Sequence, residues 1–178
     1  MARKNILTLL MGGDRRSIGR ADEVAVIVSK DLTLFPYLIA GLESEDRLVR
    51  MRAADVAEKI TRGNDGLLQP YKKQLLGLMA ETKEQELRWH LAAMIPRLVL
   101  NLRERRLAVA SLHIYLEDRS SIVKTYAIEA LANLARNDPR FEADVLEVLR
   151  EATRTGTPAM KARSRKLLLR FQARGASK

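Results

Sequence analysis

Apolar residues recur along this chain at intervals of three and four, the spacing that places them on one face of an α-helix. The pattern is clearest between residues 46 and 60, where five side chains fall on one stripe: Val49, Ala53, Val56, Ala57 and Ile60. Asp46 is placed to cap this helix, and Gly63 to follow its end. The alanines keep one side of the helix thin, so that a neighbouring helix can approach closely.

The same reasoning, with Pro, Gly and Asp as boundary signals, predicts helices through the rest of the chain. The expected helices span residues 4–11, 15–30, 32–42, 46–62, 70–81, 84–98, 103–116, 120–136, 138–153 and 158–173. No alternating run of β-branched residues stands out, so we expect an all-α protein. Pro96 is expected to kink the helix over 84–98, because proline removes a backbone hydrogen bond.

Alternate helices repeat one another. When the segments beginning at Leu48, Glu86, Ile122 and Ala159 are superposed, four apolar positions coincide, at intervals of 38, 36 and 37 residues: Val49, Leu87, Val123 and Met160. A period near 37 residues built from two helices is typical of an α-solenoid, in which each unit buries its apolar face against the next. The expected units cover about 4–30, 31–63, 66–99, 102–137 and 138–173, with a frayed tail over 174–178.

An apolar residue followed by a basic residue opens each of these second helices, and small residues follow. This register resembles the HEAT repeat, over residues 15–171. The resemblance implies one right-handed α-α superhelix of about five helix pairs. The first unit departs most, with Gly19 at the basic position. HEAT-like proteins act as scaffolds, transport receptors, enzyme subunits and some DNA-repair glycosylases, so the resemblance specifies the fold far more than the function.

The basic position of this register forms a first column of residues: Arg50, Arg88, Lys124 and Lys161. One interpretation is a ladder of cations that binds phosphates. The interpretation that we favour is structural, because the resemblance implies that this residue bonds to polar groups of the adjoining unit.

A second column lies two residues further on: Arg52, His90, Tyr126 and Arg163. These residues border the apolar stripe and are expected to reach the surface formed by the second helices. Arginines with an aromatic ring between them can follow a nucleic-acid backbone and stack on a base. The alternative is a mixed, solvated face, because carboxylates such as Asp55 and Glu129 share the same helices.

Trp89 is the only tryptophan, and it lies opposite the stripe that contains Leu87. Met51 occupies the matching region of the preceding unit. An exposed Trp near a Met is typical of a partner-binding anchor. The alternative is that Pro96 rotates the helix, or that a chain end covers the ring.

Charge is concentrated at the ends of the chain. The net charge is +10, and no carboxylate occurs after Glu151. The last predicted helix therefore combines a buried side with cations, among them Arg165, Lys166 and Arg170. This composition favours binding of a polyanion, which is nucleic acid, an acidic protein or anionic lipid, whereas the structural alternative is a polar capping helix that keeps a solenoid soluble.

Catalysis finds little support in the sequence. Cysteine is absent, only two histidines are present, and no phosphate loop, metalloprotease or hydrolase motif occurs. We expect no cofactor or metal, no membrane-spanning segment and a cytoplasmic location. The preferred function is a non-catalytic HEAT-like scaffold that binds a protein partner around Met51 and Trp89. The alternative is a nucleic-acid-binding protein, with a link to DNA repair, that uses the second column and the C-terminal helix.

Overall fold

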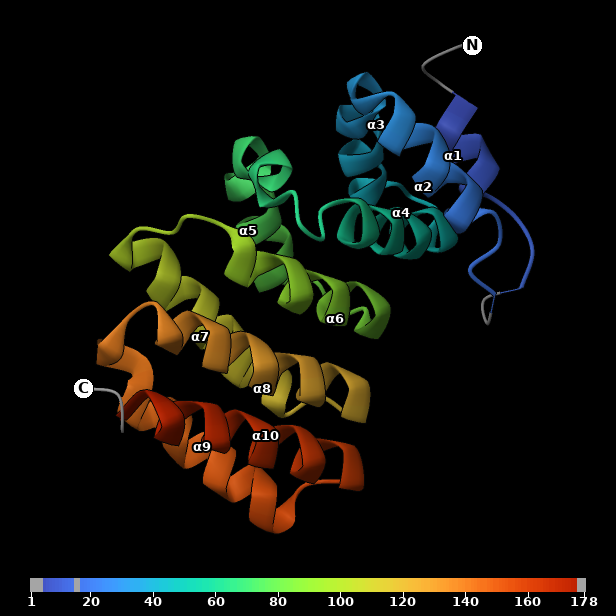
Figure 1. Cartoon of the computed structure of the whole chain (residues 1–178). Helices are drawn as coiled ribbons and strands as arrows, with labels where there is room; N and C mark the ends of the chain where they lie inside the picture. The colour runs from blue at the N-terminus through green and yellow to red at the C-terminus, as the bar shows by residue number, and fades with distance from the viewer. Residues whose placement is uncertain (1–4, 15–16, 176–178) are drawn as a thin grey trace. The chain divides into compact units, whose positions relative to one another are not determined.

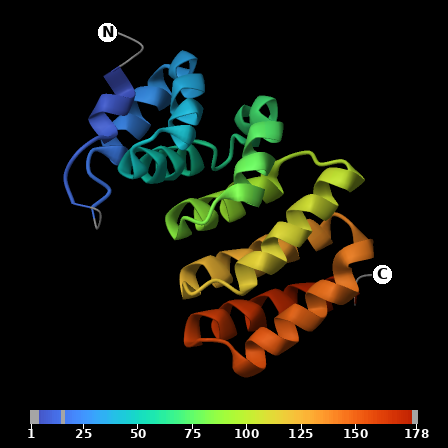
Figure 2. The same ribbon diagram turned by 180° about the vertical axis from the view of Figure 1, so that it is seen from behind.

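The residues that the structure describes, 5–14 and 17–175, are mostly helical and include no strand, which confirms the predicted all-α class. Figure 1 shows this computed structural model, and Figure 2 shows it from behind. The chain forms two compact units, Met1–Lys72 and Lys73–Lys178.

Helix α4 is the centre of the first unit, where it packs against α1, α2 and α3. Its alanines make this possible, because Ala53, Ala54 and Ala57 are fully buried and let the neighbouring backbones approach. The elements of this unit are α1 (Asn5–Leu10), α2 (Ala21–Lys30), α3 (Phe35–Ala40) and α4 (Arg47–Ile60), with the short 3₁₀ helices η1 (Leu32–Leu34), η2 (Gly41–Glu43) and η3 (Asp65–Tyr71).

The ends of α4 lie where the sequence predicts them. The Asp46 carboxylate accepts a hydrogen bond of 2.8 Å from the backbone amide of Leu48, which satisfies one of the free amides of the first turn. Gly63 follows the helix with a φ of +82°, a left-handed conformation that residues with a Cβ rarely adopt.

The two preceding helices are shorter than predicted. Helix α2 begins only at Ala21, because the chain turns at Gly19, whose φ is +56°. The predicted helix over 32–42 is divided into η1, α3 and η2, with Pro36 in the first turn of α3, where its missing N–H costs nothing.

Helix α8 is the centre of the second unit, where it packs against α6, α7, α9 and α10. The second helices α6, α8 and α10 lie side by side, with α8 in the middle (Figures 1 and 2). The elements of this unit are α5 (Lys72–Glu81, which begins at the boundary), α6 (Gln85–Met94), α7 (Leu102–Leu116), α8 (Ser121–Arg136), α9 (Glu142–Thr155) and α10 (Pro158–Gly175), with η4 (Ile95–Arg97) and η5 (Pro139–Phe141).

Pro96 has a larger effect than the predicted kink. Helix α6 ends at Met94, and residues 95–97 continue as the 3₁₀ turn η4. The proline has no N–H to donate to an α-helical carbonyl, and the tighter turn does not require that bond. The predicted helix over 84–98 is therefore shortened at its C-terminal end.

Ser164 of α10 provides a test of packing in the second unit. Its side chain is fully buried, and its hydroxyl has no hydrogen-bond partner among the residues that the structure describes. An unsatisfied buried hydroxyl costs free energy, so Ser164→Ala is expected to raise the free energy of unfolding by about 1 kcal/mol. Urea denaturation measures the change. Ser120→Ala is the matched control and should lower stability by about 1 kcal/mol, because Ser120 caps α8 by accepting from the amide of Val123.

Candidate functional site

Arg52 was expected at the surface, and the structure places it in the core of the first unit. The residue is 1% exposed. Its guanidinium makes five hydrogen bonds to backbone carbonyls of the segment between α1 and α2, those of Leu10, Gly12, Asp14 and Ser17, at 2.6–3.3 Å. The expectation of a phosphate contact at Arg52 is therefore corrected: this cation holds a loop, because the loop supplies acceptors that match its fork of N–H groups.

The members of the first column make different contacts. Arg50 bonds back to the carbonyls of Ser44 and Glu45, in the turn before its own helix. Arg88 reaches forward to the next helix pair, where its guanidinium lies 2.7 Å from the carboxylate of Asp118. Lys124 and Lys161 are half-buried.

The Arg88 contact is the centre of a small network that joins three elements. Arg88 also donates to the carbonyl of Thr82 at 2.9 Å, and its guanidinium lies 4.9 Å from the centre of the Tyr115 ring. The Tyr115 hydroxyl donates to the carbonyl of Met79 on α5 at 2.7 Å. Burial raises the pKa of the Tyr115 phenol, so the proton that this bond needs is retained. We call Arg88 and Asp118, with Tyr115, the Arg88 joint.

Asp118 and Tyr115 are the residues of this joint that the sequence analysis missed. The acceptor lies 30 residues from Arg88, so helical periodicity does not connect the two. A signal was present, because Asp118 stands two residues before the cap of α8, and its carboxylate accepts from the Ser120 amide at 2.8 Å. Aspartate is typical of such turns.

In the second unit, the residues of the second column are buried or contact a neighbouring helix. His90 is 1% exposed. Tyr126 is half-buried, and its ring centre lies 5.2 Å from that of Trp89 on the neighbouring helix. Arg163 on α10 forms an ion pair with Glu129 on α8, whose role in this contact was not predicted.

Trp89 itself is half-buried. Its ring contacts His90 as well as Tyr126, so part of the predicted anchor is already packed within the second unit. Met51 is half-buried too, but it belongs to the first unit. The docking of one partner on both residues therefore stays a prediction.

One surface of the second unit contains Trp89, Tyr126 and Arg163, whereas Met51 and Arg52 belong to the first unit and His90 is buried. On α8 the incompletely buried positions follow one stripe, and the contacts to Trp89 and Arg163 extend it onto α6 and α10. Lys166 and Arg170 follow Arg163 by three and seven residues and are exposed. We define the second-helix face by these residues: Trp89, Ala93, Ile122, Tyr126, Glu129, Asn133, Arg163, Lys166 and Arg170.

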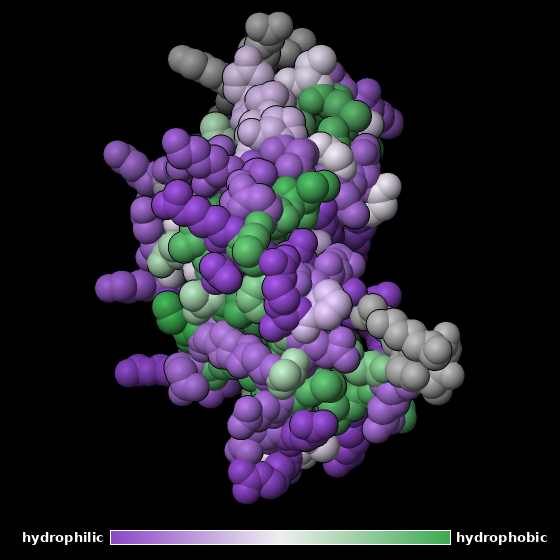
Figure 3. Space-filling model, turned by 90° about the vertical axis from the view of Figure 1, so that its left-hand side faces the viewer, coloured by the Kyte–Doolittle hydropathy of each residue, from purple (hydrophilic) through white to green (hydrophobic). Residues whose placement is uncertain are grey.

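The exposed positions of α10 give this face its charge. Arg165, Lys166 and Arg170 are exposed, and Leu169 between them is 65% exposed. The helix itself contains no carboxylate. Figure 3 shows one side of the molecule, where hydrophobic residues form several groups separated by hydrophilic ones. That side therefore offers no single large apolar area.

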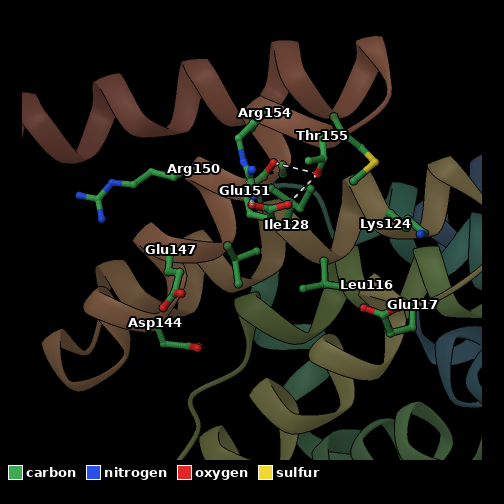
Figure 4. A pocket seen from close by; sticks show the side chains of 13 residues that line it. Leu116, Glu117, Lys124, Ile128, Asp144, Glu147, Arg150, Glu151, Arg154 and Thr155 are labelled. Atoms are coloured by element: carbon green, nitrogen blue, oxygen red, sulfur yellow. Dashed lines mark hydrogen bonds and ion pairs between the residues drawn. The ribbon is translucent and has the colours of Figure 1, made fainter.

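A groove of about 760 Å³ lies along α9, between the end of α7, the first half of α8 and the start of α10 (Figure 4). Its apolar wall includes Leu116, Ile128, Val148 and Met160. Its charged residues carry both signs: Glu117, Lys124, Asp144, Glu147, Arg150, Glu151 and Arg154. Thr155 adds a hydroxyl.

Two of these carboxylates have partners. Glu151 accepts from Arg154 and from the Thr155 hydroxyl, and the bond from Arg154 lowers the pKa of Glu151 below its usual range. Asp144 lies 2.9 Å from the ring of His113. The groove is therefore a mixed-charge surface and not a converging pair of acids.

Two further kinds of site concern metal binding and membrane crossing. Among 5–14 and 17–175, no three His, Asp or Glu side chains are grouped so as to hold a metal ion. Nor is any single helix within that range long and apolar enough to cross a membrane, although one bent pair of helices, Ala21–Lys30 with Leu32–Glu43, meets the same length and composition criterion.

Comparison with known proteins found no family model, no curated protein and no solved structure that matches the chain.

Proposed function

We propose that this chain is a non-catalytic HEAT-like scaffold, a right-handed stack of about five helix pairs, that binds an acidic segment of a protein partner on its second-helix face. The stacking is supported by contacts from one second helix to the next, made by Trp89 with Tyr126 and by Arg163 with Glu129. The Arg88 joint adds a bond between consecutive helix pairs. Repeats of this kind are held together mainly by contacts between neighbours.

The observation that carries the choice of partner is the composition of the face. Two aromatic rings, Trp89 and Tyr126, remain partly accessible on adjacent helices. Lys166 and Arg170 are exposed on the next helix along. Aromatic residues and arginine are enriched where proteins bind one another, and cations beside them favour an acidic segment.

Charge reversal on this face tests the proposal. The double variant Lys166→Glu, Arg170→Glu is expected to weaken binding of the partner at least about tenfold, because two attractive charges become repulsive. The partner is first captured from cell extract on the wild-type chain, then purified, and its affinity is measured by the fluorescence of Trp89, the only tryptophan.

Arg103→Glu, Arg106→Glu is the matched control. Both residues are exposed on α7, and the change in net charge is the same. Equal affinities of the two double variants for the purified partner would refute binding at the second-helix face.

A second candidate function is binding of single-stranded nucleic acid at the same face. The observation that favours it is the absence of carboxylates from α10, beside two rings on which bases could stack. This candidate predicts binding of an RNA or DNA oligonucleotide that weakens steeply with salt.

The salt dependence also identifies the residues. Replacing Arg165, Lys166 and Arg170 by Gln should reduce the slope of log K against log salt by about 2, at roughly 0.7 per phosphate contact on a single strand. Electrophoretic mobility shift at several salt concentrations measures the slope. If no oligonucleotide binds at low ionic strength, this second function is excluded, and the protein-partner proposal stands alone.

A further inference from the structure

The joint between α8 and α10 lacks a carboxylate that the preceding joint contains. At the Arg88 joint, the Asp118 carboxylate accepts from the guanidinium of Arg88 at 2.7 Å and from the Ser120 amide at 2.8 Å. One repeat later, 36 or 37 residues along the sequence, the corresponding residues are Lys124, Thr155 and Thr157. Lys124 keeps the positive charge of Arg88, and Thr157 keeps the hydroxyl of Ser120 before the next second helix. Thr155, however, replaces the carboxylate of Asp118.

A cavity that is open to solvent lies at this joint, and Thr155, the residue aligned with Asp118, lines it. It has a volume of about 240 Å³, and its walls contain no carboxylate: Arg119, Ser121, Lys124, Thr155, Gly156, Thr157 and Met160. A water molecule takes about 30 Å³ of liquid, so the cavity can hold an anion together with several waters. Figure 4 shows Lys124 and Thr155 at the same end of the larger groove, which shares both residues with the cavity.

The donors of this cavity suit an oxyanion. Lys124 and Arg119 supply two positive charges, and no ion pair between either of them and the described carboxylates is found. The hydroxyls of Ser121 and Thr157 lie at the first turns of α8 and α10, where backbone amides add a favourable field. Thr157 accepts from the amide of Met160, so its own proton is available to a ligand.

The nearest negative charges lie outside this cavity. Glu117 and Glu151 line only the adjoining groove. Glu151 already forms an ion pair with Arg154, and its carboxylate accepts a hydrogen bond from the Thr155 hydroxyl at 3.0 Å. Thr155 therefore donates to Glu151 and not to the cavity. The positive charges of the cavity are those of Lys124 and Arg119.

We propose that the cavity formed by Arg119, Ser121, Lys124 and Thr157 binds a phosphate-sized oxyanion, which takes the position that Asp118 holds at the preceding joint. The source of the anion is inorganic phosphate or the phosphate monoester of a peptide. The adjoining groove, with Leu116, Ile128 and Met160, accommodates apolar residues next to a phosphorylated side chain. This proposal does not depend on the function proposed above.

The test is a titration of the full chain with inorganic phosphate at constant ionic strength, held with chloride. Thermal unfolding followed by circular dichroism should shift to higher temperature as phosphate increases, because a ligand that binds only the folded state stabilises it. The backbone amides of Ser121 and Thr157 should shift in the NMR spectrum along the same binding curve. No shift in either measurement would overturn the proposal.

Two variants and a control locate the site. Lys124→Gln should weaken phosphate binding at least tenfold, whereas Arg136→Gln, which removes an exposed cation at the other end of α8, should leave it unchanged. Thr155→Asp supplies the missing carboxylate, so it should raise the melting temperature without phosphate and abolish the response to phosphate. If Lys124→Gln binds phosphate as the wild type does, or if Thr155→Asp retains the full response, the site is wrongly assigned.

A second arm identifies the source of the anion. The capped tripeptide Leu-phosphoserine-Leu is compared with inorganic phosphate and with its unphosphorylated form. Tighter binding of the phosphopeptide supports a phosphorylated chain as the ligand, and equal binding of phosphopeptide and phosphate supports the free ion. Binding of the unphosphorylated peptide as tight as that of the phosphopeptide would contradict an oxyanion site.

Discussion

Replacement of Arg52 by Met should lower the free energy of unfolding by at least about 3 kcal/mol, because the change removes the donor of five hydrogen bonds and leaves carbonyl groups around it without partners. The Met side chain retains much of the apolar stem, so loss of packing contributes little. The carbonyls of Leu10, Gly12, Asp14 and Ser17 would then have to reach water, and the backbone around them would detach from α4.

Urea unfolding followed by circular dichroism measures the loss of stability, and amide hydrogen exchange in α4 and the neighbouring loop shows where it occurs. Arg20→Met is the control, since its guanidinium is exposed and pairs only with Glu23 three residues away. That change should leave the free energy of unfolding nearly unchanged, because exposed ion pairs contribute little. A loss below about 1 kcal/mol for Arg52→Met would mean that the loop does not depend on this cation.

The second large effect is expected at Asp118. Asp118→Ala removes the acceptor of Arg88, whose side chain is only 17% exposed, and it also removes the acceptor of the Ser120 amide. A buried cation that loses its partner is costly, so the free energy of unfolding should fall by about 2 to 4 kcal/mol. Unfolding is followed by the fluorescence of Trp89, which lies beside Arg88 in α6.

A double-mutant cycle separates the pair from its surroundings. Arg88→Met in the Asp118→Ala background should cost much less than Arg88→Met alone, because the partner charge is already gone. Additive losses would show that the two side chains contribute independently. Glu151→Gln provides the exposed comparison, since its pair with Arg154 lies at the surface and should contribute much less than the Arg88–Asp118 pair.

Local features of the fold were accessible from the sequence because they depend on neighbours along the chain. The cap at Asp46 and the left-handed Gly63 follow from residue type and helical spacing. The shortened helices were not accessible to the same degree. Pro96 allowed either a kink or an end, and only the packing of the following turn decides between them.

The side chains that were misplaced share one cause, which is a partner distant in the sequence. Arg52 lies at the edge of the apolar stripe, where a surface position and a buried one look alike. Its acceptors are 35–42 residues upstream, in a loop whose course no periodicity predicts. Trp89 was correctly separated from the stripe of Leu87, but the ring of Tyr126 on α8 covers part of it.

The repeat itself was the most useful signal for the candidate sites. It aligned Arg88 with Lys124, and the structure adds that the first has a carboxylate partner and the second lines a cavity. Neither contact could be predicted from helical spacing, since both depend on the turn that precedes the next second helix. The alignment of turns, as well as helices, would have pointed to Asp118.

The most direct test of the second-helix face is photo-cross-linking in cells that produce the full chain. A photoreactive amino acid is placed at Ala93 or Asn133 on that face, and at Ala143 on the exposed side of α9 as the control. The account predicts cross-links to the same protein from both face positions and none to it from position 143. Cross-links to that protein from Ala143 alone, or none from either face position, would contradict the claim that the second helices form the binding surface.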